Sequence, residues 1–303
     1  MNIPRENADT AQTIAGVDVE KLGEVAFEVA TDAARHVRRR RPELFGRTGT
    51  APGTGNDVVP SAVSTKSTPT DPVTLADTES EELIRALLKR LRPDDAVLGE
   101  EEGGSVEVPS GVRWVIDPID GTVNFLYGIP AYAVSVAAQV DGRSVAGAVV
   151  DVARDVVYTA TLSGGAYEVR DGVRTRLRAN PISRVDLALV ATGFGYDVER
   201  RRAQGELMSR LLPRVRDLRR IGAAALDLCM VASGAVDAHI EHGLSPWDWA
   251  AGALVAAEAG AIVRTPPPDS RSADGDATVA VAPGIGEEFF ALLDEIGALK
   301  PIV

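Results

Sequence analysis

The sequence predicts a mixed fold in which an α+β lobe, residues 17–180, is followed by an α/β lobe, residues 181–303. In the first lobe, short β-rich runs separated by Asp-Gly and Gly-Gly pairs predict antiparallel strands joined by tight turns. In the second, short apolar runs alternate with helical patterns, which is typical of an α/β arrangement. A chain of 303 residues, 45% of them apolar, is long enough for two lobes with a shared core.

The N-terminal quarter of the chain predicts a tail, two helices and a loop between them. Residues 1–16 are polar and show no clear period, so we expect a disordered tail. Apolar residues at helical spacing predict a helix from Val17 to about Arg41, and we expect Pro42 to end it. Residues 46–66 are rich in Gly, Pro, Ser and Thr and predict a long mobile loop. A second amphipathic helix is predicted from about Asp77 to Leu91.

The rest of the chain supplies the strands and the remaining helices. In the first lobe the strand-like runs are 96–99, 112–117, 131–140, 144–152, 155–161 and 164–170. In the second lobe they are 187–192, 215–219, 236–241, 261–264 and 278–282. The helical patterns of that lobe are 198–212, 223–233, 247–259 and 285–298. The order favours a fold in which helices pack on sheets.

Charge and cysteine content narrow the class of protein. The net charge of −12 opposes a broad nucleic-acid-binding surface, so we expect no direct nucleic acid binding. Anionic substrates stay possible, because bound cations would reverse the field locally. The one cysteine, Cys229, lies in an apolar helical run and predicts a buried thiol. The chain shows no secretory signal and no apolar run of about 18 residues, so we expect a cytoplasmic protein without a membrane span.

The segment from Asp117 to Thr122 is the most informative motif of the chain. Two carboxylates, Asp117 and Asp120, follow an apolar run, and Pro118 is expected to end the strand there. Gly121 permits a tight turn, and the hydroxyl of Thr122 follows. Hard oxygen ligands beside backbone N–H groups suit divalent cations and a phosphate. An enzyme is therefore the leading interpretation.

Three further acidic segments accompany this motif. Glu100 to Glu102 follow a short strand-like run, Asp77 opens the second helix, and Asp248 lies where an apolar helix begins. Each alone is consistent with a solvated acidic turn or a helix cap. A two-metal phosphatase site needs acids that converge from separate segments, and the combination supplies them.

In this combination the chain resembles the inositol monophosphatase family, from about residue 20 to the C-terminus. The family pattern is an Asp, then Glu-Glu, then Asp-Pro-Ile/Leu-Asp-Gly-Thr/Ser, then Trp-Asp. Here these elements are Asp77, Glu100-Glu101, Asp117 to Thr122, and Trp247-Asp248. The resemblance implies a layered αβαβα sandwich of the sugar-phosphatase type with the metal site between two lobes. It also implies a homodimeric, magnesium-dependent and lithium-sensitive phosphatase that hydrolyses inositol 1-phosphate.

The resemblance further implies a set of metal ligands. Glu100, Asp117 and the backbone carbonyl of Ile119 would hold one Mg²⁺ ion. Asp117, Asp120 and Asp248 would hold a second, and a third, weaker ion would contact Glu100 through waters. Two or three ions are therefore expected.

Catalytic and phosphate-binding roles follow from the same resemblance. Thr122 and Asp77 would orient the attacking water, and Glu100 would assist. The N–H groups of Gly121 and Thr122 would hold phosphate oxygens. Lys66 stands where the family has a lysine near the site.

The substrate pocket is expected to come from the second lobe. By the resemblance, Glu241 and Asp120 would bond substrate hydroxyls, and Ala224 would lie against the ring. The turn at 192–196 is expected near the pocket. Its shape is left undecided, because Gly195 replaces a proline that is common in relatives. Arg219 and Arg220 are interpreted as surface residues, with contact to a second phosphate as the alternative.

Several alternatives remain. His239 and His242 flank Glu241, but the apolar surroundings of His239 favour a structural role over phosphoryl transfer. The same metal chemistry would serve histidinol phosphate, fructose 1,6-bisphosphate or a 3′-phosphonucleotide. A regulatory protein-binding role is the alternative from another class.

Overall fold

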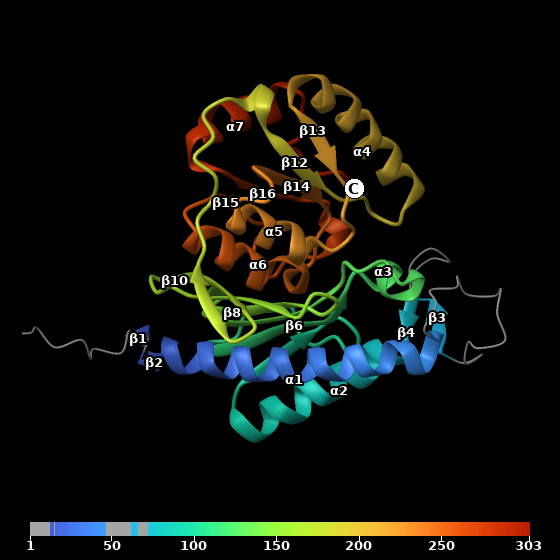
Figure 1. Ribbon diagram of the computed structural model, residues 1–303, viewed down its shortest axis with the longest axis vertical. Helices are drawn as coiled ribbons and strands as arrows, with labels where there is room; N and C mark the ends of the chain where they lie inside the picture. Colours follow the sequence, from blue (N-terminus) through green and yellow to red (C-terminus); the bar gives the residue numbers. More distant parts are fainter. Residues whose placement is uncertain (1–12, 15, 47–61, 66–71) are drawn as a thin grey trace, which may run out of the picture.

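The computed structural model describes residues 13–14, 16–46, 62–65 and 72–303 in five layers (Figure 1). The expected tail at 1–16 and loop at 46–66 lie mostly outside the described residues, as does Lys66. Two helices form the outer layer of the first half, α1 (Val19–Phe45) and α2 (Leu75–Leu91). Short paired strands flank them: β1 (Thr13–Ile14), β2 (Val17–Asp18), β3 (Val63–Thr65) and β4 (Pro72–Thr74).

The second layer is a seven-stranded sheet. Its strands are β5 (Ala96–Gly99), β6 (Val112–Asp120), β7 (Ala133–Val140), β8 (Arg143–Asp151), β9 (Val156–Thr161), β10 (Gly165–Arg170) and β11 (Val173–Arg176). Their order is β11-β10-β9-β8-β7-β6-β5, so successive strands lie side by side. The predicted antiparallel pairing holds from β6 to β11, whereas β5 and β6 are parallel. That parallel pair is a correction, and it places the C-terminal ends of both strands at the same edge.

The inner helices and the second sheet complete the layers. Helices α5 (Ala224–Ser233) and α6 (Pro246–Glu258) lie between the sheets, and α4 (Val198–Leu211) and α7 (Gly286–Glu295) cover the outer face (Figure 1). The five strands are β12 (Leu189–Thr192), β13 (Asp217–Arg219), β14 (Ala238–His242), β15 (Ile262–Arg264) and β16 (Ala277–Val281). Their order is β13-β12-β14-β16-β15, with β12 parallel to β13 and β14. The layered αβαβα sandwich is therefore confirmed.

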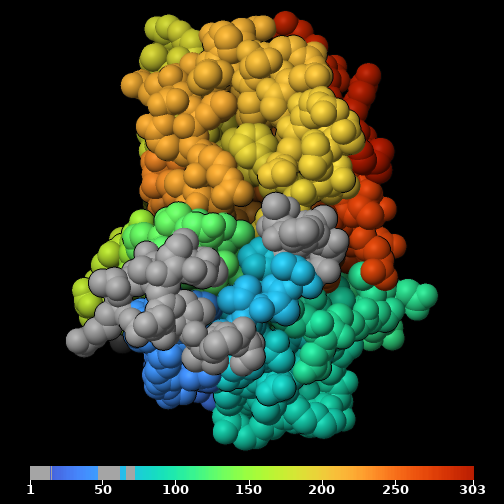
Figure 2. Space-filling model, turned by 90° about the vertical axis from the view of Figure 1, so that its right-hand side faces the viewer, coloured from blue at the N-terminus to red at the C-terminus, as the bar shows by residue number. Residues whose placement is uncertain are grey.

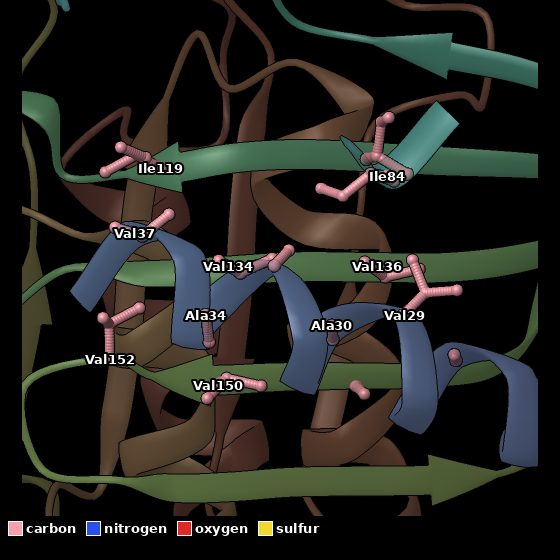
Figure 3. Close-up of a cluster of buried hydrophobic side chains, with 14 of the residues drawn as sticks. Val29, Ala30, Ala34, Val37, Ile84, Ile119, Val134, Val136, Val150 and Val152 are labelled. Carbon is pink, nitrogen blue, oxygen red and sulfur yellow. The ribbon is translucent and has the colours of Figure 1, made fainter. Parts of the chain in front are cut away.

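Helix α1 extends beyond its predicted end. Pro42 lies inside the helix, which ends at Phe45, and the N–H of Gly46 bonds the carbonyl of Pro42 over 3.1 Å. Leu44 and Phe45 are buried, so burial of the last turn offsets the hydrogen bond that proline removes. The middle of the apolar face, around Val29 and Ala30, packs on the sheet (Figure 3).

Strand β6 also extends further than predicted. It continues through Pro118 to Asp120, and the register with β7 shifts between Asp117 and Asp120. Proline is tolerated there because the ladder is already irregular at that point. The side chain of Ile119 lies in the core near Val37 of α1 (Figure 3). Asp117 and Asp120 line a cavity instead.

The expected boundary near residue 180 falls between the last strand of the first sheet and the first strand of the second. The division into two lobes at that residue remains a prediction. Within the described ranges, no helix has both the length and the apolar character that crossing a membrane requires.

Candidate active site

A cavity of about 520 Å³ lies where the end of β6 meets the start of α5 and α6 and the end of β14. On this side the molecular surface is hollowed between the yellow atoms near residue 200 and the orange atoms of the later segments (Figure 2). Nine of the predicted site residues line the cavity: Glu100, Asp117, Ile119, Asp120, Gly121, Thr122, Ala224, Glu241 and Asp248. The tertiary fold thus brings together residues from both halves of the chain.

Asp77 lies directly behind the cavity wall and is fully buried. It is the third residue of α2 and forms a capping box with Thr74, whose N–H donates to Asp77 Oδ2 over 2.9 Å. Its other oxygen, Oδ1, accepts the hydroxyl of Thr122 over 3.0 Å. The cap therefore fixes the carboxylate while its second oxygen serves Thr122.

Asp248 repeats this device at the start of α6. It is the third residue of the helix, and its Oδ2 accepts the N–H of Ser245 over 2.6 Å in a second capping box. Burial, together with the charges of Glu100 and Asp120, raises the pKa of Asp248 well above its usual range. The reading of Asp248 as a simple cap is thus half right, because the residue caps the helix and faces the cavity.

Asp120 is held by the N-terminal end of α5. Its Oδ1 and Oδ2 accept the N–H groups of Ala224 and Ala225 at the start of α5, over 3.2 and 2.8 Å. Burial and the nearby charge of Glu100 raise the pKa of Asp120 to about 7, although these N–H donors oppose the shift. The shift therefore comes first from burial and then from the repulsion of a neighbouring carboxylate.

Asp117 completes the acidic cluster. One carboxylate oxygen from each of Asp117, Asp120 and Asp248 lies within 4.8 Å of the other two. The N–H of Ile119 donates to Asp117 Oδ1 over 3.0 Å, which fixes this carboxylate at the irregular end of β6. An all-oxygen donor set of three carboxylates fits Mg²⁺. The residues present therefore suit the ion that the sequence predicts.

Glu81 is a site residue that sequence reasoning missed. Its fully buried carboxylate accepts the N–H groups of Glu101 and Glu102, over 2.8 and 2.9 Å, and pairs with Arg85. It thereby holds the turn that presents Glu100 to the cavity. The available signal was its position four residues after Asp77, which puts both acids on one face of α2.

The Gly121 turn joins the two halves of the site. Gly121 has φ of 90°, and a side chain there would meet the carbonyls of Ala131 and Gly222 at 3.0 Å. Asn124, in α3 (Thr122–Tyr127), donates to the carbonyls of Ala131 and Ile221 over 2.7 and 2.8 Å. Only glycine therefore fits between the end of β6 and the segment that leads into α5.

The opposite wall of the cavity carries Glu241, at the end of β14. Burial raises the pKa of Glu241 to about 8, and the nearby charge of Arg220 opposes that shift. Gly193 backs the carboxylate so closely that an added Cβ would lie 2.2 Å from both of its oxygens. The predicted turn at 192–196 thus reaches the pocket, with Phe194, Gly195 and Tyr196 also on its wall.

Some of the remaining residues that the sequence singled out lie at the cavity and others do not. Arg219 is exposed and pairs with Asp217, as expected of a surface residue, whereas the exposed Arg220 lines the cavity. The surface interpretation of Arg220 is thus incomplete. His242 is buried and bonds the carbonyl of Ala298 over 2.9 Å, and the thiol of Cys229 is buried as predicted.

The layered fold and the acidic cavity between its sheets define a phosphatase of the layered sugar-phosphatase class. A model of the inositol monophosphatase family matches residues 18–296. The chain therefore belongs to that metal-dependent family, and the predicted enzyme class, a phosphoric monoester hydrolase, is confirmed.

Named relatives agree with this assignment. "Inositol-1-monophosphatase SuhB" of Mycobacterium tuberculosis is 52% identical over 286 residues, 93% of this chain and 96% of the relative. The solved structure "Mycobacterium tuberculosis SuhB" has a TM-score of 0.76 and 46% identity, covering 93% of this chain and 98% of that one. A relative from Pasteurella multocida, 41% identical over 196 residues, is named "Nus factor SuhB" and covers 64% of this chain and 71% of the relative.

Proposed function

We propose that this protein hydrolyses inositol 1-phosphate to inositol and phosphate by direct, magnesium-dependent attack of water. The observation that carries the proposal is one cavity with three parts. It has the carboxylate cluster of Asp117, Asp120 and Asp248, Glu241 on the facing wall, and Thr122, whose hydroxyl bonds Asp77 behind the wall. The names of the mycobacterial relatives support the substrate.

The carboxylates divide into two overlapping ligand sets. Glu100, Asp117 and the carbonyl of Ile119 would hold one Mg²⁺, and Asp117, Asp120 and Asp248 the other, with Asp117 shared. Bound Mg²⁺ would lower the pKa of a bound water and stabilise the charge on the leaving oxygen. A third ion near Glu100 is part of the same proposal.

Thr122 and Asp77 hold the attacking water in this proposal. The Thr122 hydroxyl has one proton and two acceptors within reach, Asp77 Oδ1 at 3.0 Å and the carbonyl of Ile119 at 3.1 Å. When that proton points to Asp77, a lone pair of the hydroxyl is left to accept a hydrogen bond from water. As the water gives a proton to Thr122 Oγ1, the hydroxyl proton of Thr122 passes to the buried Asp77, and Glu100 assists from the cavity side.

The first turn of α3 receives the phosphate. The N–H groups at the start of a helix have no intrahelical partner, and those of Gly121 and Thr122 face phosphate oxygens in this proposal. Opposite them, Glu241 and Asp120 accept hydrogen bonds from substrate hydroxyls. Ala224 is small and nearly buried, which leaves room for the ring.

Phosphate release from a panel of monoesters tests the substrate directly. We expect the highest kcat/KM for inositol 1-phosphate with Mg²⁺, above histidinol phosphate, fructose 1,6-bisphosphate and a 3′-phosphonucleotide. Turnover should cease with EDTA and fall at millimolar lithium when Mg²⁺ is limiting. A higher kcat/KM for another member of the panel would replace the proposed substrate without changing the class of enzyme.

A regulatory role is a second candidate, favoured by the relative named "Nus factor SuhB". The Asp117→Asn variant separates the two, because it removes a metal ligand and leaves the exposed surface unchanged. If a cell that lacks the native protein is fully restored by this variant, protein contacts carry the function. Loss of restoration contradicts a purely binding role.

The homodimer expected from the family is part of this proposal and is tested by light scattering.

A further inference from the structure

A second polar cluster lies behind Glu241, outside the cluster of Asp117, Asp120 and Asp248. Its members are Asp227 of α5 and His239 and Glu241 of β14. His239 and Glu241 are two residues apart on one strand, so their side chains project from the same face of the sheet. Asp227 belongs to α5, which packs against β14, and its Oδ2 lies 3.9 Å from His239 Nδ1. One donor atom from each of the three lies within 4.8 Å of the others.

The two inner members are buried without hydrogen bonds. Asp227 is 1% exposed and His239 is 0% exposed. Within the described part of the chain, neither carboxylate oxygen of Asp227 and neither ring nitrogen of His239 has a hydrogen-bond partner. An unsatisfied buried polar atom costs about 1–3 kcal/mol, so four in one place indicate a missing partner.

The neighbouring strand adds a further polar atom. Thr278 lies directly opposite Glu241 in the antiparallel pair β14–β16, so both side chains project from one face. Thr278 is fully buried, and its hydroxyl likewise has no hydrogen-bond partner among the residues described. The unsatisfied atoms therefore extend from α5 across β14 to β16.

The donor set matches a divalent transition metal better than Mg²⁺. One imidazole and two carboxylates are borderline ligands of the kind that Zn²⁺ accepts, whereas Mg²⁺ takes oxygen alone. Ligands at about 2.1 Å from one ion lie at most about 4.2 Å apart. The separation of 3.9 Å between Asp227 and His239 already meets that limit. Burial lowers the pKa of His239 to about 3, so its imidazole is in the neutral form that binds metals.

We propose that Asp227, His239 and Glu241 form a second metal site, specific for Zn²⁺-like ions, that withdraws Glu241 from the cavity when occupied. An ion there satisfies Asp227 and His239 and holds the carboxylate that faces the substrate. Zn²⁺ would therefore inhibit by competing for Glu241. The inhibition rests on the proposed function, whereas metal binding itself does not.

Cobalt binding tests the site independently of activity. Co²⁺ is titrated into metal-free protein with Mg²⁺ in excess, which occupies the all-oxygen cluster, and visible absorption is recorded. We expect one Co²⁺ per chain, with the intense band of a four- or five-coordinate ion. His239→Phe, which keeps bulk and removes the nitrogens, should abolish the band. His36→Ala, at a histidine on α1 that pairs with Glu79, should leave it unchanged.

A second variant keeps the test valid if His239→Phe fails to fold. Asp227→Asn keeps size and hydrogen-bonding capacity and should weaken Co²⁺ binding about tenfold or more. A band that survives in both variants, or no Co²⁺ bound beyond the level of His239→Phe, overturns the site. The cluster then holds water or a proton shared by Asp227 and His239.

Activity gives the second readout. With excess Mg²⁺, Zn²⁺ should raise KM for inositol 1-phosphate in the wild type and lose that effect in His239→Phe. Co²⁺ binding without any change in KM supports the metal site and contradicts the proposed role of Glu241 in substrate binding. The two proposals can therefore fail separately.

Discussion

The hydroxyl of Thr122 donates to Asp77 Oδ1 over 3.0 Å, joining two residues 45 positions apart. Asp77 is fixed from its other side by the capping box of α2, so a helix cap orients the residue after β6. The same arrangement occurs at Asp248, where a second capping box holds a carboxylate that faces the cavity. Local capping rules thus position two of the acidic side chains of the site.

Loss of the Thr122 hydroxyl should reduce turnover with little effect on substrate binding. Thr122→Val keeps the shape of the side chain and removes the hydroxyl that we propose contacts the attacking water, so we expect kcat to fall by about 10²-fold or more. Steady-state kinetics on inositol 1-phosphate measure the effect. Thr122→Ser restores the hydroxyl and should stay within about tenfold of the wild type. Equal losses in both variants would contradict a role for the hydroxyl.

Glu81 should contribute to both stability and metal binding. In Glu81→Gln the amide group can no longer accept both N–H groups of Glu101 and Glu102, so one donor loses its partner. We expect the free energy of unfolding to fall by about 1–3 kcal/mol in urea denaturation. The Mg²⁺ concentration for half-maximal activity should rise, because the turn that carries Glu100 loosens. The neighbouring Glu82→Gln, at an exposed position, is the control and should change neither quantity.

Gly193 should determine how well the substrate binds. In Gly193→Ala the new Cβ would lie 2.2 Å from both carboxylate oxygens of Glu241, so that side chain must move away. The carboxylate is the end of a flexible side chain, so stability changes little, but kcat/KM should fall about tenfold. Gly205→Ala is a matched control in α4, since no atom lies within 4 Å of its added Cβ. That control should keep full activity and gain about 0.5–1 kcal/mol of stability.

Glu241 should make the metal-free protein less stable as the pH rises. Burial raises the pKa of Glu241 from 4.5 to about 8 in the folded state, so the folded state binds more protons between these values. The free energy of unfolding then falls with increasing pH across that window, on the order of 1 kcal/mol for each unit of the shift.

Urea denaturation in EDTA, from pH 4.5 to 8, measures this slope. Glu241→Gln carries no titrating proton and should make the slope shallower, and the slope that remains belongs to Asp120 and Asp248, whose pKa values burial also raises. The control is Glu206→Gln, at an exposed position of α4, which should keep the slope of the wild type. An unchanged slope in Glu241→Gln would show that another group dominates the window.

Local sequence patterns were sufficient for most elements and insufficient at two prolines. Pro42 and Pro118 were expected to end a helix and a strand, yet both elements continue past them. Proline acts on the local backbone, whereas burial of Leu44 and Phe45 and the irregular pairing of β6 with β7 are tertiary effects. The parallel pairing of β5 with β6 was missed for the same reason, since strand direction is set by long-range packing.

By itself, the sequence determined the family, the layered fold class and the acids that could bind metal. Those features depend on the order and spacing of motifs such as Asp117 to Thr122, which local chemistry constrains. Only the tertiary structure decided which residues meet. It placed Glu81 under the Glu100 turn, Gly193 behind Glu241, and Asp227 beside His239. The physical reason is that burial and contact depend on how the layers pack, and no short stretch of sequence contains that information.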